Sequence, residues 1–227
     1  MLKILCVIPA LPNDLKQETL ESVHNQTVPI DYLLIVSERI TDNISFPAKI
    51  SKALNNAFSH INLEGFDYIL RVDGDTIIPA NFVEENLKEN PHVTGDGDAM
   101  LIHVPSFLKV MSGRFFKEQD DTYIRFKFAQ DGLKSTDLRV QPIRTRKCGA
   151  KHSYRYYVER GEIMYRFGYE PLHVLSKFIL DRRNAFLVYG YLKAAMLHYG
   201  RYDVYDYVRR EQASHFLQLR SKLRAYI

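Results

Sequence analysis

Two aspartates separated by one residue, Asp73 and Asp75, form the most informative motif of this sequence. They follow the apolar run 68–72 (YILRV), so both carboxylates are expected at the end of a buried strand. Carboxylate oxygens in this arrangement suit Mg²⁺ or Mn²⁺, and either cation would neutralise a diphosphate group. Gly74, between them, allows a tight turn and the close approach of a ligand. The motif therefore predicts a cation site that serves a phosphate-containing substrate.

One other enzyme class shares this local pattern. The haloacid dehalogenase phosphatases begin with an apolar strand followed by Asp-x-Asp-x-Thr. Here Thr76 comes one position too early and Ile77 occupies the position of the Thr. The motif also follows the third expected strand instead of the first, which argues against a phosphatase of this class.

A second acidic cluster, residues 118–121 (EQDD), follows the aromatic segment 113–116 (GRFF). A carboxylate here could accept a proton from an attacking hydroxyl, and crowded carboxylates raise one another's pKa as a general base requires. Alternatively, Asp120 caps a solvent-exposed helix start. The spacing leaves both interpretations open.

Three further side chains suit a phosphate or a cation. Lys52 and Asn55 lie off the apolar face of a helix expected over 48–61, so they reach a diphosphate or a sugar, or are simply solvated. His152, in the basic stretch 147–157, is a candidate to complete the cation site or to touch a phosphate. A lone His in such a stretch is also a common surface residue.

The elements that position these residues alternate between strand and helix over the first 100 residues. Strands are expected over 2–8, 31–36 and 68–72, each buried, and helices over 14–25, 48–61 and 81–87, the last with Asn81 and Glu84 as a capping box. This order predicts an α/β fold with a Rossmann-like, mostly parallel sheet flanked by helices. Ligands of such sheets bind beyond the carboxyl ends of the strands, where Pro9, Glu38 and Asp73 fall.

The rest of the chain is less regular and then becomes helical. A strand is expected over 99–104, a short helix over 105–111, a helix or strand over 122–129, and a half-exposed strand over 138–143. Beyond residue 154 the pattern is mostly helical. We therefore expect a catalytic domain over 1–153 and a helical C-terminal segment over 154–227.

Charge and tyrosine content separate these two parts. Residues 1–149 hold 17 Lys and Arg against 20 Asp and Glu, whereas residues 150–227 hold 14 against 7 and carry 12 of the 15 tyrosines. Basic residues interleaved with amphipathic aromatics suit a phosphate-rich partner, either a membrane interface or a nucleic acid. A solvated helical surface packed through tyrosine rings would have the same composition.

Composition also limits the compartment. Two cysteines, Cys6 and Cys148, exclude a disulfide framework and favour a reducing environment, with Cys6 as a buried thiol. Asp14 and Lys16 follow the N-terminal apolar run too soon for a signal peptide. No stretch reaches the roughly 18 uncharged apolar residues of a spanning helix. We expect a cytoplasmic protein, either soluble or peripheral on the cytoplasmic face of a membrane.

Taken together, these motifs resemble the family 2 glycosyltransferases of the GT-A fold over residues 1–170. VIPA at 7–10 is similar to the family's opening strand, and KALN at 52–55 to the helix before its central strand. RVDGDTIIPANFVEENL at 71–87 resembles its strand, Asp-x-Asp, Pro and helix. Residues 97–128 look like the acceptor segment, which ends in a paired acidic motif that would make Asp121 the catalytic base.

The resemblance implies inverting transfer of a single sugar from a nucleotide-diphosphate sugar to an acceptor hydroxyl or lipid phosphate, on a glycan or a lipid-linked acceptor. The implied catalytic residues are Asp121 and Asp120, the metal ligands Asp73, Asp75 and His152, and the other donor contacts Pro9, Ala10, Glu38, Lys52, Asn55 and Gly74. Glu38 stands where the family has Asp, and Glu118 with Gln119 is an alternative register for the acidic pair. The absence of Trp excludes the Gln-x-x-Arg-Trp motif of processive synthases.

Other functions remain as alternatives. A nucleotidyltransferase would need a Gly-rich loop after the first strand, and residues 9–16 (PALPNDLK) contain no Gly. Another phosphate-binding α/β protein and a retaining transferase stay open, because Asp-x-Asp occurs in both stereochemical classes. A nucleic-acid-binding module would use the basic C-terminal segment, but no signature of one is present, so no nucleic-acid partner is expected.

Overall fold

The computed structural model describes residues 2–116, 118–145, 154–180 and 184–224. The chain divides into two compact units, Met1–Cys148 and Gly149–Ile227, and each is described by itself.

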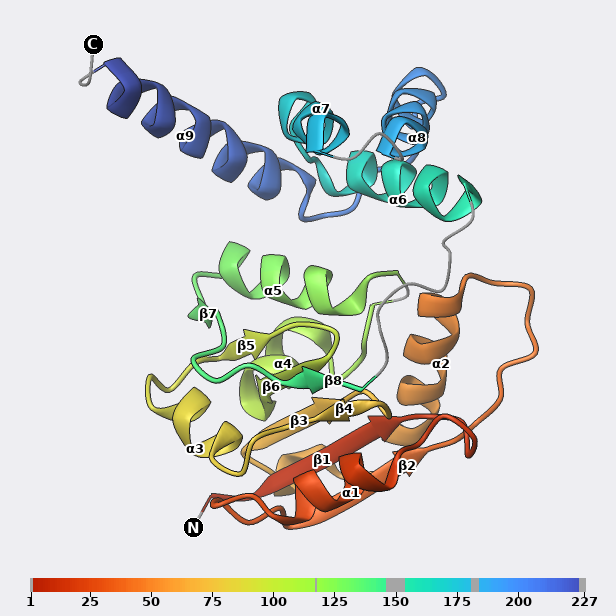
Figure 1. Cartoon of the computed structure of the whole chain (residues 1–227), viewed down its shortest axis with the longest axis vertical. Helices are drawn as coiled ribbons and strands as arrows, with labels where there is room; N and C mark the ends of the chain where they lie inside the picture. The colour runs from red at the N-terminus through yellow and green to blue at the C-terminus, as the bar shows by residue number, and fades with distance from the viewer. Residues whose placement is uncertain (1, 117, 146–153, 181–183, 225–227) are drawn as a thin grey trace. The chain divides into compact units, whose positions relative to one another are not determined.

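The first unit is built on a sheet whose described part has six strands in the order β2-β1-β3-β6-β5-β7 (Figure 1). The strands are β1 (Ile4–Pro9), β2 (Tyr32–Val36), β3 (Tyr68–Val72), β5 (Val93–Gly95), β6 (Ala99–His103) and β7 (Ser135–Thr136). β1 runs parallel to both β2 and β3, β5 runs parallel to β7, and β6 is antiparallel to β3 and β5. The expected α/β fold with a mostly parallel sheet is confirmed.

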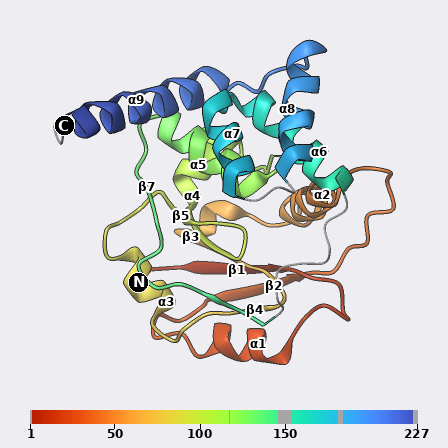
Figure 2. The same ribbon diagram turned by 45° about the horizontal axis from the view of Figure 1, so that its top comes forward.

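Helices cover both faces of this sheet. They are α1 (Gln17–His24), α2 (Phe46–Phe58), α3 (Phe82–Leu87), α4 (Val104–Met111) and α5 (Asp120–Gln130), with the 3-10 helix η1 (Leu63–Gly65) before β3. Figure 2 shows α1 and α2 on opposite sides of β1. A small second sheet pairs β4 (Thr76–Ile77) with β8 (Ile143–Arg144).

The alternation of side chains along β1 produces two hydrophobic cores. Leu5 and Val7 face α2, α4 and α5, whereas Ile4, Cys6 and Ile8 face α1 and α3. All five are fully buried, as expected for a strand covered on both faces. Burial raises the pKa of the Cys6 thiol, which confirms the expectation of a buried thiol at this position.

Three local predictions were wrong. β2 is not a buried strand: among the described strands it pairs with β1 alone, at the edge of the sheet, and Tyr32 and Ile35 are 50% and 41% exposed. Among the described residues the side chain of Asn81 makes no capping hydrogen bond, and the side chain of Glu84 accepts a hydrogen bond from Thr27 Oγ1 at 2.8 Å.

The third error is the half-exposed strand over 138–143, of which only Ile143 lies in a strand. The side chain of Asn86 forms hydrogen bonds with the backbone of this segment. Its Oδ1 accepts from the N–H groups of Arg139 and Val140, at 2.6 and 3.2 Å, and its Nδ2 donates to Val140 O at 3.1 Å. A side chain therefore satisfies these groups in place of a neighbouring strand.

The second unit is helical, with α6 (Tyr154–Phe167), α7 (Pro171–Leu180), α8 (Ala185–Met196) and α9 (Tyr205–Arg224). α6 and α8 cross in backbone contact: a Cβ on Gly161 would lie 2.0 Å from Leu187 O, and one on Gly190 would lie 2.0 Å from Val158 O. The two glycines make this close packing possible. Of the helices in the described ranges, none combines the length and apolar composition that a membrane crossing needs.

Candidate functional site

The carboxyl ends of β2, β1 and β3 lie side by side at one edge of the sheet. Pro9 is in register with Val36, and the backbone N–H of Ala10 donates to Val36 O at 3.1 Å. On the other side, a Cβ on Gly74 would lie 2.5 Å from the Cβ of Ala10. The residues that follow the three strands are therefore neighbours, as the topology of a parallel sheet requires.

The Asp73–Gly74–Asp75 turn is held rigidly by its backbone. Gly74 O accepts hydrogen bonds from Lys16 N at 2.9 Å and from Thr19 Oγ1 at 3.1 Å. Asp75 O accepts from both the N–H and the hydroxyl of Thr145, at 2.9 and 2.8 Å. Residues near the start of the unit and near its end thus fix the main chain of the turn. The conformation of the turn then sets the direction of both carboxylates.

The Asp73 carboxylate lies in a crowded negative environment. Its side chain is 35% exposed, and burial is the main cause that raises its pKa to about 7. Arg71 opposes this shift, whereas the carboxylates of Asp98, Asp75 and Asp120 add to it. A divalent cation would favour the ionised form, so the electrostatics of the turn fit a cation.

The donor atoms fit a cation that also binds substrate phosphate. Within the described ranges, no three His, Cys, Asp or Glu side chains gather closely enough to hold a metal ion by themselves. Asp98, whose carboxylate adds to the raised pKa of Asp73, is paired with Arg144. His152 lies outside the described residues. Mg²⁺ commonly uses one or two carboxylates, water and substrate phosphates, and Asp73 with Asp75 provides such a pair.

The two adjacent aspartates at the start of α5 have different environments. Asp120 is buried, and its Oδ2 lies 2.5 Å from Nη1 of Arg71, whose side chain is 5% exposed. The interpretation of Asp120 as an exposed helix cap is therefore wrong, because the N-cap residue is Gln119. Asp121 is only partly buried, and its Oδ2 lies 3.3 Å from the position that a Cβ on Gly97 would take. Of the pair, Asp121 is the carboxylate that a substrate can reach.

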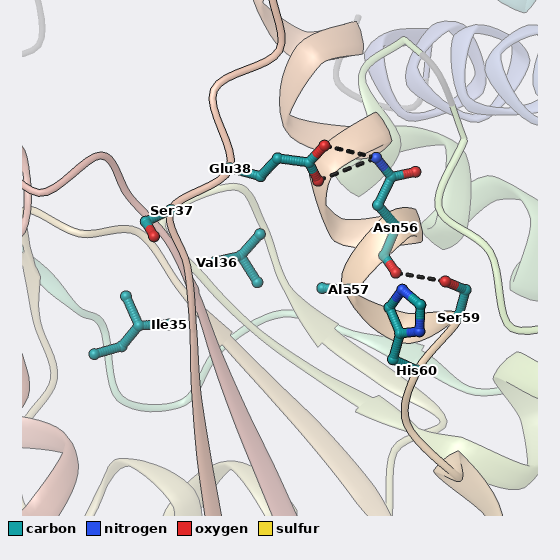
Figure 3. A pocket seen from close by; sticks show the side chains of 8 residues that line it. All are labelled: Ile35, Val36, Ser37, Glu38, Asn56, Ala57, Ser59 and His60. Atoms are coloured by element: carbon teal, nitrogen blue, oxygen red, sulfur yellow. Dashed lines mark hydrogen bonds between the residues drawn. The ribbon is translucent and has the colours of Figure 1, made fainter.

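A cavity of about 490 Å³ lies between the end of β2 and α2 (Figure 3). Figure 3 shows Glu38, which follows β2, hydrogen-bonded through both carboxylate oxygens to Nδ2 of Asn56, at 2.9 and 3.0 Å. Ser37, Ser59 and His60 also line this cavity. Its size and polar lining suit one ring system of a larger ligand.

The polar side chains of helix α2 contact different parts of the first unit. Asn55 exchanges two hydrogen bonds with the backbone of Phe115: its Nδ2 donates to Phe115 O at 3.0 Å, and its Oδ1 accepts from Phe115 N at 2.7 Å. Lys52 is paired with Asp42. The sequence prediction named Asn55 and missed Asn56, which lines the cavity. Both lie off the apolar face of the helix, so no sequence pattern separates them.

Comparisons with known proteins give matches to solved structures only. No protein-family model and no curated sequence matches the chain. Among solved structures, similar chains include a Drosophila β1,4-galactosyltransferase 7 in complex with manganese, UDP-Gal and xylobiose, with 16% identity and a TM-score of 0.42, covering 66% of this chain and 78% of that one.

Two structures of Staphylococcus aureus TarS are also similar. A 1–349 fragment in complex with UDP has 12% identity and a TM-score of 0.48, and covers 72% of this chain and 64% of that one. A second TarS structure has 14% identity and a TM-score of 0.47, and covers 92% and 55%. The chain thus spans less than two thirds of either TarS chain. At this level of identity, the similarity concerns the path of the backbone only.

Gly74→Ala is expected to lower any cation-dependent activity by about a hundredfold, the usual effect of misplacing reacting groups by about 1 Å. The new Cβ would lie 2.5 Å from the Cβ of Ala10 and 3.4 Å from Asp14 O, so the turn has to shift. Turnover and melting temperature measure the effect. Gly65→Ala is the matched control, because a Cβ there meets nothing within 4 Å. Equal activities of the two variants would contradict the prediction.

Proposed function

We propose that this chain is a nucleotide-sugar-dependent glycosyltransferase of the GT-A, family 2 type, which transfers a single sugar with inversion. The observation that carries the proposal is the convergence of three features: the Asp73–Gly74–Asp75 turn, the cavity beside Glu38, and the accessible carboxylate of Asp121 at the start of α5. Together they correspond to a diphosphate site, a base site and a general base.

Each part of the donor has a proposed place. The nucleotide base enters the cavity and meets Glu38 and Asn56, which are already hydrogen-bonded to each other. The diphosphate lies over Pro9, Ala10 and Gly74, where the absence of a Gly74 side chain permits close approach. Lys52, which is exposed on α2, is a further candidate contact for the phosphates.

The cation, held by Asp73 and Asp75, would supply charge neutralisation for the departing nucleoside diphosphate. His152 stays a proposed third ligand. Asp121 accepts the proton of the acceptor hydroxyl as its oxygen forms a bond to the anomeric carbon. The bond between that carbon and the diphosphate oxygen breaks on the opposite face, and the electron pair leaves with the nucleoside diphosphate.

The test is release of nucleoside diphosphate from UDP-, GDP- and dTDP-sugars, measured with Mn²⁺, with Mg²⁺ and with EDTA. We expect cation-dependent release from one donor, lowered at least about a hundredfold in Asp75→Ala. Asp131→Ala, at an exposed position after α5, is the matched control and should keep full activity. The anomer of the product distinguishes inversion from retention.

Two results would contradict the proposal. Failure to bind any donor would assign the aspartate pair to another phosphate ligand. Release of pyrophosphate from a nucleoside triphosphate and a sugar phosphate would identify a nucleotidyltransferase instead.

We also propose that the second unit binds an anionic membrane surface on the cytoplasmic side, where a lipid-linked acceptor would be available. Its helices α7 and α8 each expose a row of large apolar side chains at helical spacing: Leu172, Leu175 and Phe178 on α7, and Phe186, Tyr189, Leu192 and Met196 on α8. Large apolar side chains exposed in rows, and not singly, are typical of an interaction site. The excess of 14 basic over 7 acidic residues in 150–227 favours an anionic partner.

Flotation with vesicles tests this second proposal. We expect the protein to float with vesicles that contain anionic lipid and not with purely zwitterionic ones, and Met196→Glu, at a position 70% exposed, to lower the bound fraction several-fold, as a charge placed in an apolar contact does. Ile143→Glu, at a position 60% exposed in the first unit, is the control. Equal loss in both variants, or no flotation at all, would contradict membrane binding through α8.

A further inference from the structure

Arg71 is a charged residue at a position where the sheet otherwise carries apolar side chains. All five residues of β3 are buried, and the alternation of the strand places Arg71 on the same face as Ile69, toward α2 and α5. Its side chain is 5% exposed. A buried strand is an unfavourable place for a cation, because its solvation by water is lost.

The contacts of Arg71 do not fully offset this loss. Its guanidinium lies 2.5 Å from Asp120 Oδ2 and 3.7 Å from Asp73 Oδ1. Its Nε finds no hydrogen-bond partner among the described residues. Replacing a buried ion pair by apolar side chains of similar volume is often neutral or stabilising. Stability alone therefore does not account for an arginine here, and such departures from packing rules are expected at functional sites.

Among the described residues, the first turn of α5 lacks a side-chain N-cap hydrogen bond, although Tyr123 in that turn stacks on Phe116. The N-cap residue Gln119 has a left-handed backbone, with φ of 47°, and makes no side-chain capping hydrogen bond. An N-cap side chain usually holds the first turn of a helix. Here the buried contact of Asp120 with Arg71 takes that place, one residue before Asp121.

We propose that Arg71 is a positioning residue that ties the first turn of α5, and thereby Asp121, to the Asp73 side of the site. The inference rests on the proposed function for the roles of Asp73 and Asp121. A guanidinium is suited to this task because its planar fork fixes the direction of a carboxylate that it contacts. One side chain near the carboxyl end of β3 thus links the two elements that carry the cation site and the base.

The decisive variant is Arg71→Met combined with Asp120→Leu, which removes both charges and retains side-chain volume. We expect it to fold, to bind nucleoside diphosphate and Mn²⁺ within about threefold of the original affinity, and to keep its KM for the donor, while kcat falls by about 10- to 100-fold because Asp121 is misplaced. Arg71→Lys keeps the charge without the fork, so it should recover only part of kcat.

A second background tests whether the effect passes through Asp121. In the Asp121→Asn variant, the further substitutions Arg71→Met and Asp120→Leu should lower kcat by no more than about threefold. The reason is that the effects of substitutions on kcat do not add when the residues act as one unit. Full additivity would overturn the inference, and so would an original kcat in the doubly substituted variant.

Amide hydrogen exchange gives a readout that is independent of activity. The amides of residues 120–123 should exchange about tenfold faster in the doubly substituted variant, while those of residues 124–130 keep their rates. Unchanged exchange at 120–123 would overturn the inference that Arg71 holds the first turn of α5, whether or not the protein transfers sugar. Faster exchange in a protein that transfers no sugar would mean that only the proposed function fails. Should the doubly substituted variant not fold, Arg71→Lys decides the inference by the same exchange rates.

Discussion

Replacing Asp121 by Asn will lower kcat for sugar transfer by about 10²- to 10⁴-fold, the range over which a positioned general base contributes. Asn has nearly the same shape but cannot accept the proton of the acceptor hydroxyl. Asp121 is partly exposed, and its Oδ2 faces the loop at Gly97, so the substitution leaves no buried charge without a partner. Donor affinity and melting temperature should therefore stay close to their original values.

The measurement is steady-state transfer over a range of donor concentrations, with donor binding determined separately. Loss of kcat with unchanged donor affinity identifies a group that acts in the transition state. Glu118→Gln serves as the comparison, because Glu118 belongs to the alternative register of the acidic cluster. If Glu118→Gln abolished transfer and Asp121→Asn did not, the base would be Glu118.

The central strands β1 and β3 were predictable because they are buried on both faces. The apolar run 68–72 coincides with β3, and the alternation of apolar strands with helical segments led to the correct fold class. The edge strand β2 has the same composition as a buried strand, and composition does not tell how many neighbours a strand has. This is why its exposed residues Tyr32 and Ile35 were not anticipated.

The side-chain partners were not predictable, because they are distant in sequence. Asp120 and Asp121 are equivalent as a sequence pair, and only Arg71, 49 residues away, separates their roles. In the same way, Asn55 and Asn56 differ because Phe115 lies 60 residues from the first and Glu38 lies 18 residues from the second. Sequence patterns report local periodicity, whereas the function of these residues depends on contacts made only in the folded chain.

Replacing Asp120 by Ala will lower the free energy of unfolding by about 3–5 kcal/mol, the usual effect of removing one partner of a buried ion pair. Arg71 would keep its charge with only Asp73, at 3.7 Å, as a partner, and its Nε already has none among the described residues. The free energy of unfolding of a domain is commonly about 5–15 kcal/mol, so the loss is a large part of the total.

Urea unfolding followed by circular dichroism measures this loss. Asp121→Asn, in contrast, should keep the free energy of unfolding of the original protein. Asp120→Ala should lose stability, and kcat of its folded fraction should also fall by about 10- to 100-fold, because the contact with Arg71 that positions Asp121 is lost. Adding Arg71→Met to Asp120→Ala should restore most of the stability, because the unpaired cation is then removed. If Asp120→Ala were as stable as the original protein, the short contact between Asp120 and Arg71 would not be an ion pair that the fold depends on. Stability therefore separates the two neighbouring aspartates: Asp121→Asn should lower the rate and leave stability unchanged, whereas Asp120→Ala should lower both, although the sequence presents the two residues as a single motif.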